Sequence, residues 1–159
     1  MIPPAQIDLS TPDGIVSAFL EHGITPADVK GITPDELEAV YDELCTRVAD
    51  EQFSSALDLA HFLVTHQPWD RRFVFAFALC LQQLGNFEAA ARHFSEAYVM
   101  DVTDAGCAYR IGECMEALGE RDDAREAYKT ALDLSFIGGG APEIRDAAQA
   151  RLDTIDAPA

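Results

Sequence analysis

The chain has 159 residues, and 48% of them are hydrophobic. This length and composition fit one folded domain with its own core and argue against general disorder. The formal net charge at neutral pH is −17, so the surface repels the phosphates of nucleic acids and the headgroups of anionic lipids. We therefore expect neither nucleic acid nor a membrane surface as a direct partner.

The start of the sequence shows none of the features of a signal peptide, because residues 1–4 lack a basic region followed by an apolar one. No apolar run approaches the roughly 20 residues of a membrane span. The four cysteines form no CxxC pair; they are Cys45, Cys80, Cys107 and Cys114. We interpret them as small buried thiols of a reducing compartment, with a redox or metal role as the alternative.

Thr-Pro pairs predict where the first three helices begin. These pairs lie at 11–12, 25–26 and 33–34, and each places a capping side chain before a proline that fits the first helical position. They predict helices over 12–22 and 26–30 and a third helix from 34. Thr33 and Glu36 also form a capping-box pattern. The first helix has an apolar stripe, which consists of Ile15, Val16, Phe19 and Leu20.

A repeat with a period of 34 residues follows. Small, aromatic and turn-forming residues recur in the pairs Ala78/Gly112, Gly85/Gly119, Ala90/Ala124, Phe94/Tyr128 and Ala97/Ala131. The period predicts three helix–turn–helix units over 37–70, 71–104 and 105–138. Small residues let the paired helices approach, and the glycine ends the first helix in a left-handed conformation. The first unit departs from the pattern, since Leu44 and Leu63 replace small residues and Glu51 replaces the glycine.

These residues at this spacing match the tetratricopeptide repeat, in which neighbouring helix pairs stack because one pair cannot bury its apolar face alone. After the glycines at 138–140, Pro142 begins a last helix with one apolar face, formed by Ile144, Ala148, Leu152 and Ile155. The predicted fold is an all-α solenoid of three helix pairs. It has an N-terminal extension over 1–33, the repeats over 34–138, and a capping helix and tail over 139–159.

No group of residues predicts catalysis. The histidines at 22, 61, 66 and 93 form no i, i+4 pair, and none stands in a metal-ligand pattern with cysteine or carboxylate. The glycine run lacks the Lys-Ser/Thr of a phosphate-binding loop, and no strand precedes it. We therefore expect no enzyme, no metal and no cofactor, and predict that the chain functions through a binding surface.

The first helix of each repeat in such a solenoid lines a concave wall. Twelve residues are expected to face it: Glu38, Tyr41, Cys45, Val48, Arg72, Phe75, Leu79, Gln82, Gly106, Tyr109, Glu113 and Glu116. Aromatic rings recur at one matched position, which is that of Tyr41, Phe75 and Tyr109. We predict an apolar groove with an acidic end that binds an extended peptide, formed by Tyr41, Cys45, Val48, Arg72, Phe75, Leu79, Gln82 and Tyr109. The alternative is that the aromatic residues belong to the core.

Several segments together resemble a known family. A glycine-flanked segment over 23–32 precedes Leu-Glu-Ala-Val-Tyr at 37–41, and Trp-Asp-Arg-Arg-Phe at 69–73 and Phe-Glu-Ala-Ala at 87–90 follow. Over about residues 14–135 the chain thereby resembles the class II chaperones of bacterial type III secretion, which guard two hydrophobic translocator proteins. The glycine-flanked turn before Leu-Glu-x-x-Tyr is the more specific feature, because the repeats alone occur in many families.

The resemblance implies a protein of the bacterial cytoplasm that binds pore-forming translocators before export and keeps them soluble. Family members hold an extended segment with proline and aliphatic anchors in the groove, and some also bind a transcriptional activator. Cys45 and Val48 stand where the family commonly has larger aromatic residues, so the first anchor pocket departs from the family's pattern. The second hypothesis is a scaffold or adaptor that binds a folded partner across a broad face.

The resemblance also implies self-association, because family members often form homodimers through their N-terminal helices. It assigns this role to the apolar stripe of Ile15, Val16, Phe19 and Leu20. The alternative is that this helix packs on its own first repeat.

Overall fold

The computed structural model describes residues 8–137 and 140–157, and all regular secondary structure within them is α-helical. Residues 1–4 and the glycines at 138 and 139 lie outside this part. The helices are α1 (Pro12–His22), α2 (Pro26–Lys30), α3 (Pro34–Ala49), α4 (Phe53–His66), α5 (Arg71–Gln83), α6 (Phe87–Met100), α7 (Ala105–Leu118), α8 (Arg121–Leu134) and α9 (Pro142–Asp156). Within the described residues no helix is both long and apolar enough to pass through a bilayer. The predicted all-α class is confirmed.

The first three helices begin where the threonines predict. Thr11, Thr25 and Thr33 are extended residues whose side chains accept a hydrogen bond from an N–H of the first turn. The Thr33 N–H also donates to the Glu36 carboxylate over 2.8 Å, which completes the predicted capping box. A second box, which was not predicted, joins the Thr25 N–H to Asp28 over 2.7 Å. Hydrogen bonds from these threonine N–H groups lower the pKa of both carboxyls.

Small residues bring the paired helices together as predicted. Ala78, Ala90 and Ala97 are fully buried. A Cβ placed on Gly112 in α7 would lie only 2.6 Å from Cε1 of Tyr128 in α8. The Tyr128 ring is itself fully buried. The close approach of α7 and α8 therefore depends on the missing side chain at position 112.

The turns between the paired helices share one backbone conformation. Gly85 and Gly119 have φ values of 80° and 81°, in the left-handed region that favours glycine. Glu51 stands at the equivalent place in the first pair and keeps a positive φ of 58°. The turn is thus preserved without its glycine, at a cost in backbone strain that a glycine would not have.

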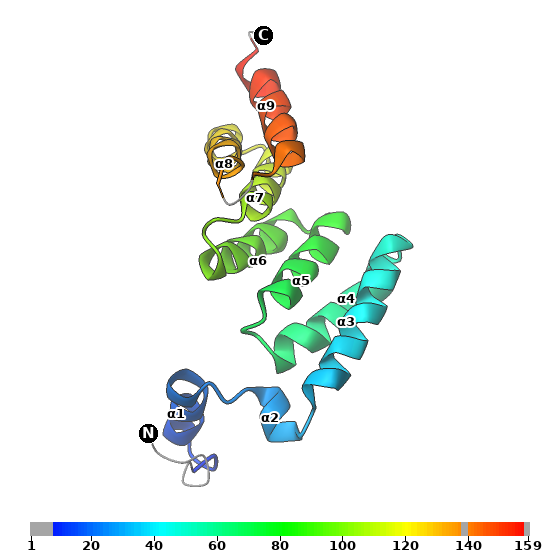
Figure 1. Ribbon diagram of the computed structural model, residues 1–159, viewed down its shortest axis with the longest axis vertical. Helices are drawn as coiled ribbons and strands as arrows, with labels where there is room; N and C mark the ends of the chain where they lie inside the picture. The colour runs from blue at the N-terminus through cyan, green and yellow to red at the C-terminus, as the bar shows by residue number, and fades with distance from the viewer. Residues whose placement is uncertain (1–7, 138–139, 158–159) are drawn as a thin grey trace.

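The helix pairs stack along the molecule, with α1 and α9 at opposite ends (Figure 1). From α3 to α9 each helix packs on the next one in sequence, and α9 also contacts α7. Buried side chains form successive clusters between the layers, around Leu44 and Phe73, then Phe94, then Tyr128 with Leu152. The core is therefore a row of small clusters.

The last helix packs with the predicted face. Ala148, Leu152 and Ile155 are buried against the third pair, and Ile144 is half-buried beside Ala148. Arg121 of α8 donates a hydrogen bond to the Ile155 carbonyl. The apolar face of α8 is thereby covered.

Candidate peptide-binding groove

The three matched aromatic rings are half-buried, each against a buried ring behind it. The ring centroids of Tyr41 and Phe73 lie 5.4 Å apart, those of Phe75 and Phe94 lie 5.2 Å apart, and those of Tyr109 and Tyr128 lie 5.4 Å apart. Phe73, Phe94 and Tyr128 are fully buried. Each matched ring therefore packs on the core and keeps part of its surface accessible.

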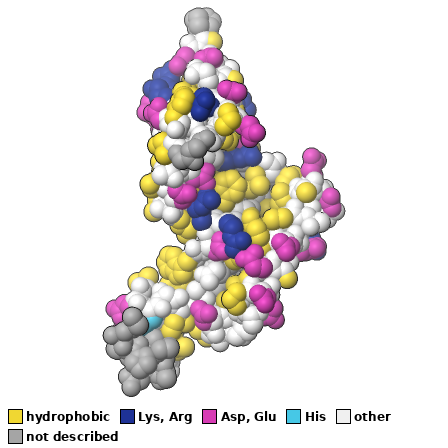
Figure 2. Space-filling view, viewed as in Figure 1, with side chains coloured by type: hydrophobic (Ala, Val, Ile, Leu, Met, Phe, Trp, Pro, Cys, Tyr) yellow, Lys and Arg dark blue, Asp and Glu magenta, His cyan; other side chains and the backbone are white. Residues whose placement is uncertain are grey.

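The structure brings four residues of the predicted wall into one pocket. Tyr41 from α3, Arg72 and Phe75 from α5, and Gly106 from α7 line a pocket of about 190 Å³ together with Arg71 and Asp104. Figure 2 shows hydrophobic side chains gathered in the hollowed middle of the molecule, bordered by basic and acidic ones. The pocket spans the first helices of all three repeats.

Arg72 fixes the first part of this pocket. Its Nη2 lies 2.6 Å from Glu38 Oε1 and 2.7 Å from Asp70 Oδ2. Its guanidinium carbon lies 5.1 Å from the centroid of the Tyr41 ring and 5.4 Å from that of Phe73. This arginine joins α3 to the start of α5 by charge and by cation–π contact.

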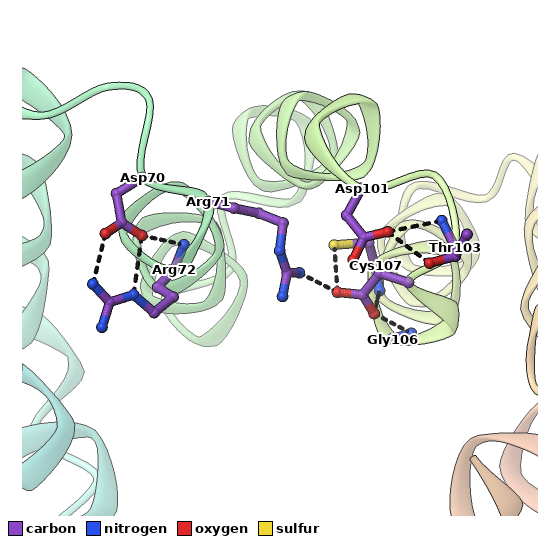
Figure 3. A network of polar contacts seen from close by, with 8 residues as sticks. Asp70, Arg71, Arg72, Asp101, Thr103, Gly106 and Cys107 are labelled. Carbon is purple, nitrogen blue, oxygen red and sulfur yellow. Dashed lines mark hydrogen bonds and ion pairs between the residues drawn. The ribbon is translucent and has the colours of Figure 1, made fainter. Parts of the chain in front are cut away.

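Arg71 makes the next link, from α5 to α7. Its Nη1 donates to Asp104 Oδ2, while Asp104 Oδ1 caps α7 by accepting from the Gly106 N–H at 2.7 Å. Figure 3 shows Arg71 and Arg72 on opposite sides of the α5 start, each turned toward a different neighbouring helix. The sequence pattern missed Arg71, because it is the first residue of its repeat and not one of the expected wall positions.

The other predicted groove residues lie along the wall in different environments. Cys45 is exposed, while Val48 and Leu79 are half-buried and pack against the core clusters. Gln82 is only 7% exposed, and its Nε2 donates to Glu113 Oε2 over 3.0 Å. Gln82 therefore belongs to a partly buried polar cluster and offers little surface to a ligand.

The predicted acidic end of the groove is wrong. Arg110 Nη1 lies 2.9 Å from Glu113 Oε2, and Arg151 Nη1 lies 3.5 Å from Glu116 Oε1. Glu116 also accepts a hydrogen bond from the Tyr128 hydroxyl over 2.7 Å. Burial, reinforced by this bond, raises the pKa of Tyr128. This end of the wall is polar but charge-paired.

The prediction of four buried thiols holds for three of them. Cys80, Cys107 and Cys114 are buried, whereas Cys45 is exposed on α3. Burial raises the pKa of the three buried thiols to about 11, 12 and 11, respectively. Among the described residues no group of three or more histidines, cysteines or carboxylates is arranged to hold a metal ion.

The N-terminal helix divides the predicted stripe between two roles. The Phe19 ring packs against Trp69 with centroids 5.1 Å apart. Ile15, Val16 and Leu20 are 53%, 55% and 68% exposed. One residue of the stripe therefore packs on the chain's own first repeat, and three remain largely exposed.

The chain is similar in sequence and in fold to proteins of type III secretion. The chain is 24% identical over 119 residues to the low calcium response locus protein H of Yersinia pestis, across 75% of this chain and 71% of that protein. A type III secretion system complex from Aeromonas hydrophila matches with a TM-score of 0.83 at 24% identity, over 89% of this chain and 94% of that one. The Yersinia enterocolitica type III secretion chaperone SycD, solved with a peptide of the translocator YopD, matches with a TM-score of 0.74 at 22% identity, over 78% of this chain and 95% of SycD.

These likenesses show the fold and confirm the resemblance that the sequence predicts. A family model described as anaphase-promoting complex, cyclosome, subunit 3 also matches residues 49–131, from the end of α3 into α8. This match covers more than half of the chain and agrees with a solenoid of helical repeats. By this match, the chain belongs to the family described as anaphase-promoting complex, cyclosome, subunit 3.

Proposed function

We propose that this chain is a chaperone of the bacterial cytoplasm that binds hydrophobic type III secretion translocators and keeps them soluble before export. The observation that carries the proposal is the pocket of Tyr41, Phe75 and Gly106, to which the first helices of all three repeats contribute. SycD, which shares the fold, is known in complex with a translocator peptide. An extended segment of the client would lie along the same wall here.

The half-buried rings suit a reversible chaperone. Burying one apolar anchor on such a wall contributes about 1.5–3 kcal/mol, and ordering the segment offsets part of this gain. Two or three anchors at Tyr41, Phe75 and Tyr109 therefore give moderate affinity. A carrier that must later release its client requires affinity of this order.

Self-association through α1 is a second part of the proposal. Ile15, Val16 and Leu20 present apolar surface that the chain itself leaves open. A homodimer would cover it, and Phe19, held by Trp69, would set the position of the helix. A transcriptional activator is the proposed partner once the translocators have been exported.

Co-purification tests the groove. The tagged chain is expressed in its native background, and captured proteins are identified by mass spectrometry. We expect a protein with long apolar segments, and we expect Tyr41→Ala with Phe75→Ala to lose it while helicity is kept. Phe62→Ala with Tyr98→Ala is the matched control, because these half-buried rings lie on the second helices α4 and α6.

Two results would contradict the proposal. One is full capture of the client by the Tyr41/Phe75 double variant. The other is a captured protein without membrane-spanning segments, which would indicate a different class of partner.

Limited proteolysis of the captured complex then defines the protected segment of the client, from which a synthetic peptide is made.

A further inference from the structure

We propose that Arg71 binds the main chain of the extended segment, by donating hydrogen bonds to its carbonyl oxygens. The proposal rests on the proposed function, since it concerns how the same groove holds its client. It assigns a binding role to a residue outside the repeat positions that usually face the groove.

The first argument is that Arg71 has N–H groups to spare. Within residues 8–137 and 140–157, the oxygen that accepts a hydrogen bond from Arg71 belongs to Asp104, and Nη1 makes this bond. Its Nε and Nη2 groups donate to no oxygen in the described part of the chain. The side chain is 36% exposed and lines the pocket with Tyr41 and Phe75. Free donors therefore stand where a bound segment would pass.

The neighbouring arginine, Arg72, uses its guanidinium nitrogens for hydrogen bonds within the chain. Arg72 donates from Nε, Nη1 and Nη2 to the carboxylates of Glu38 and Asp70, over 2.6 to 3.2 Å. All three of its side-chain nitrogens are thus engaged in holding the wall together. Of the two arginines in the pocket, Arg71 is the one that can serve a ligand.

An extended client needs such a donor. Each of its residues carries a carbonyl, and a carbonyl pressed onto an aromatic wall without a partner costs free energy. The N–H groups inside the wall helices are committed to helical hydrogen bonds. The Arg71 guanidinium, which lines the same pocket as Tyr41 and Phe75, supplies the donor that the wall otherwise lacks.

The surrounding charges favour a neutral acceptor. Arg71 is already paired with Asp104, so the pair carries no net charge. A client carboxylate would meet Asp104 directly and would also approach Glu38 and Asp70, which are held by Arg72 at the other side of the pocket. A backbone carbonyl has no such repulsion and still takes a charge-assisted hydrogen bond.

Gly106 leaves room for a main chain beside Arg71. It occupies the repeat position that Glu38 and Arg72 fill in the other repeats, and it lines the same pocket. The atoms that a Cβ placed there would meet within 4 Å belong to Asp104. The third repeat therefore presents backbone at the point where the first two present long side chains.

Binding of the protected client peptide tests the proposal. Titration calorimetry compares the wild type with Arg71→Gln, Arg71→Lys and the control Arg92→Gln, whose arginine is on α6 and 66% exposed. We expect Arg71→Gln to weaken binding at least about tenfold, because a hydrogen bond from a charged donor is lost. The affinity of Arg71→Lys should lie between those of the wild type and Arg71→Gln, and Arg92→Gln should bind the peptide as the wild type does.

A series of peptides, each with one backbone amide replaced by an ester, gives a readout that a purely structural role would not move. An ester carbonyl is a weaker acceptor, so one or two positions should weaken binding to the wild type. At those positions Arg71→Gln should show no additional loss. Circular dichroism verifies the fold, and if Arg71→Gln does not fold, the ester series is measured on Arg71→Lys.

The outcomes separate the two proposals. Unchanged peptide affinity of Arg71→Gln would overturn the role of Arg71 but not the proposed function. The same holds if the loss of affinity caused by Arg71→Gln is fully additive with the loss caused by every ester substitution. The role of Arg71 would also be overturned if its substitution no longer weakened binding once an acidic side chain was removed from the peptide. That result would indicate an ion pair between Arg71 and this side chain. A peptide that binds the Tyr41/Phe75 double variant as well as the wild type would overturn the proposed function itself.

Discussion

The guanidinium of Arg72 lies over the Tyr41 ring, 5.1 Å from its centroid, and thereby couples the second repeat to the first aromatic position of the groove. The same guanidinium pairs with Glu38 on α3, one turn before Tyr41. The ring therefore contacts Arg72 as well as the buried ring of Phe73. The orientation of this anchor depends on a side chain of the neighbouring repeat.

Arg72→Met is expected to affect binding more than stability. Methionine keeps much of the apolar stem but removes the charge and the cation–π contact. Because both ion pairs are partly exposed to solvent, the free energy of unfolding should fall by less than about 1 kcal/mol. Affinity for the client peptide should fall several-fold, because Tyr41 loses its fixed orientation. Urea unfolding and calorimetry measure the two effects, with Arg92→Met as control. A stability loss of several kcal/mol with unchanged affinity would contradict this role.

Glu51→Gly is expected to stabilise the fold. Glu51 has a φ of 58°, where an L side chain is strained and glycine is not. The gain should be up to about 1 kcal/mol in the free energy of unfolding, measured by urea denaturation. The neighbouring change Asp50→Gly is the control, since Asp50 has a φ of −85°. Equal effects of the two substitutions would show that the turn strain is not relieved.

Gly112→Ala is expected to destabilise the third helix pair. The added methyl group would meet Tyr128 at 2.6 Å, and a fully buried ring has little room to move. Overpacking of this kind costs about 1–3 kcal/mol. Thermal unfolding followed by circular dichroism measures it, with Gly106→Ala as a comparison that meets no buried ring. An unchanged unfolding temperature would mean that α7 and α8 separate without cost.

Stability is expected to fall at alkaline pH because of the buried thiols. Burial raises the pKa of Cys80 and Cys114 to about 11 and that of Cys107 to about 12. An unfolded thiol ionises near pH 8.5, so the folded state binds more protons above that pH. The contribution is complete below about pH 8.5 and is lost as the pH rises through 11 to 12.

Urea unfolding between pH 8 and 10 measures this loss. Replacing the three buried cysteines by alanine should flatten the slope of stability against pH, although it lowers stability overall by leaving small cavities. Cys45→Ala is the control, because its thiol is exposed. An identical slope in the triple variant would assign the alkaline loss to other groups.

The fold could be predicted from the sequence because its rules are local or periodic. Three helix starts are predicted by capping threonines, which are Thr11, Thr25 and Thr33. The 34-residue period predicts the positions of Ala78, Gly85 and Phe94. These features depend on neighbours within a turn or on matching positions in successive repeats. The structure confirms these helix starts and these repeat positions.

The polar part of the groove could not be predicted, because it depends on pairs between repeats. Arg71 meets Asp104, and Gln82 meets Glu113, across 33 and 31 residues. Arg151 neutralises Glu116 from the capping helix. A repeat pattern gives the position of each side chain but not the partner toward which it turns. The acidic end was wrong for this reason, and Arg71 was missed.

Photocrosslinking from the groove tests the central claim most directly. A photoreactive phenylalanine analogue replaces Phe75, or Tyr98 as the control on α6, in the chain co-expressed with its captured client. We predict that position 75 crosslinks to one short segment of the translocator and that position 98 does not. Crosslinks from position 98 but none from position 75 would contradict a client held on the concave wall.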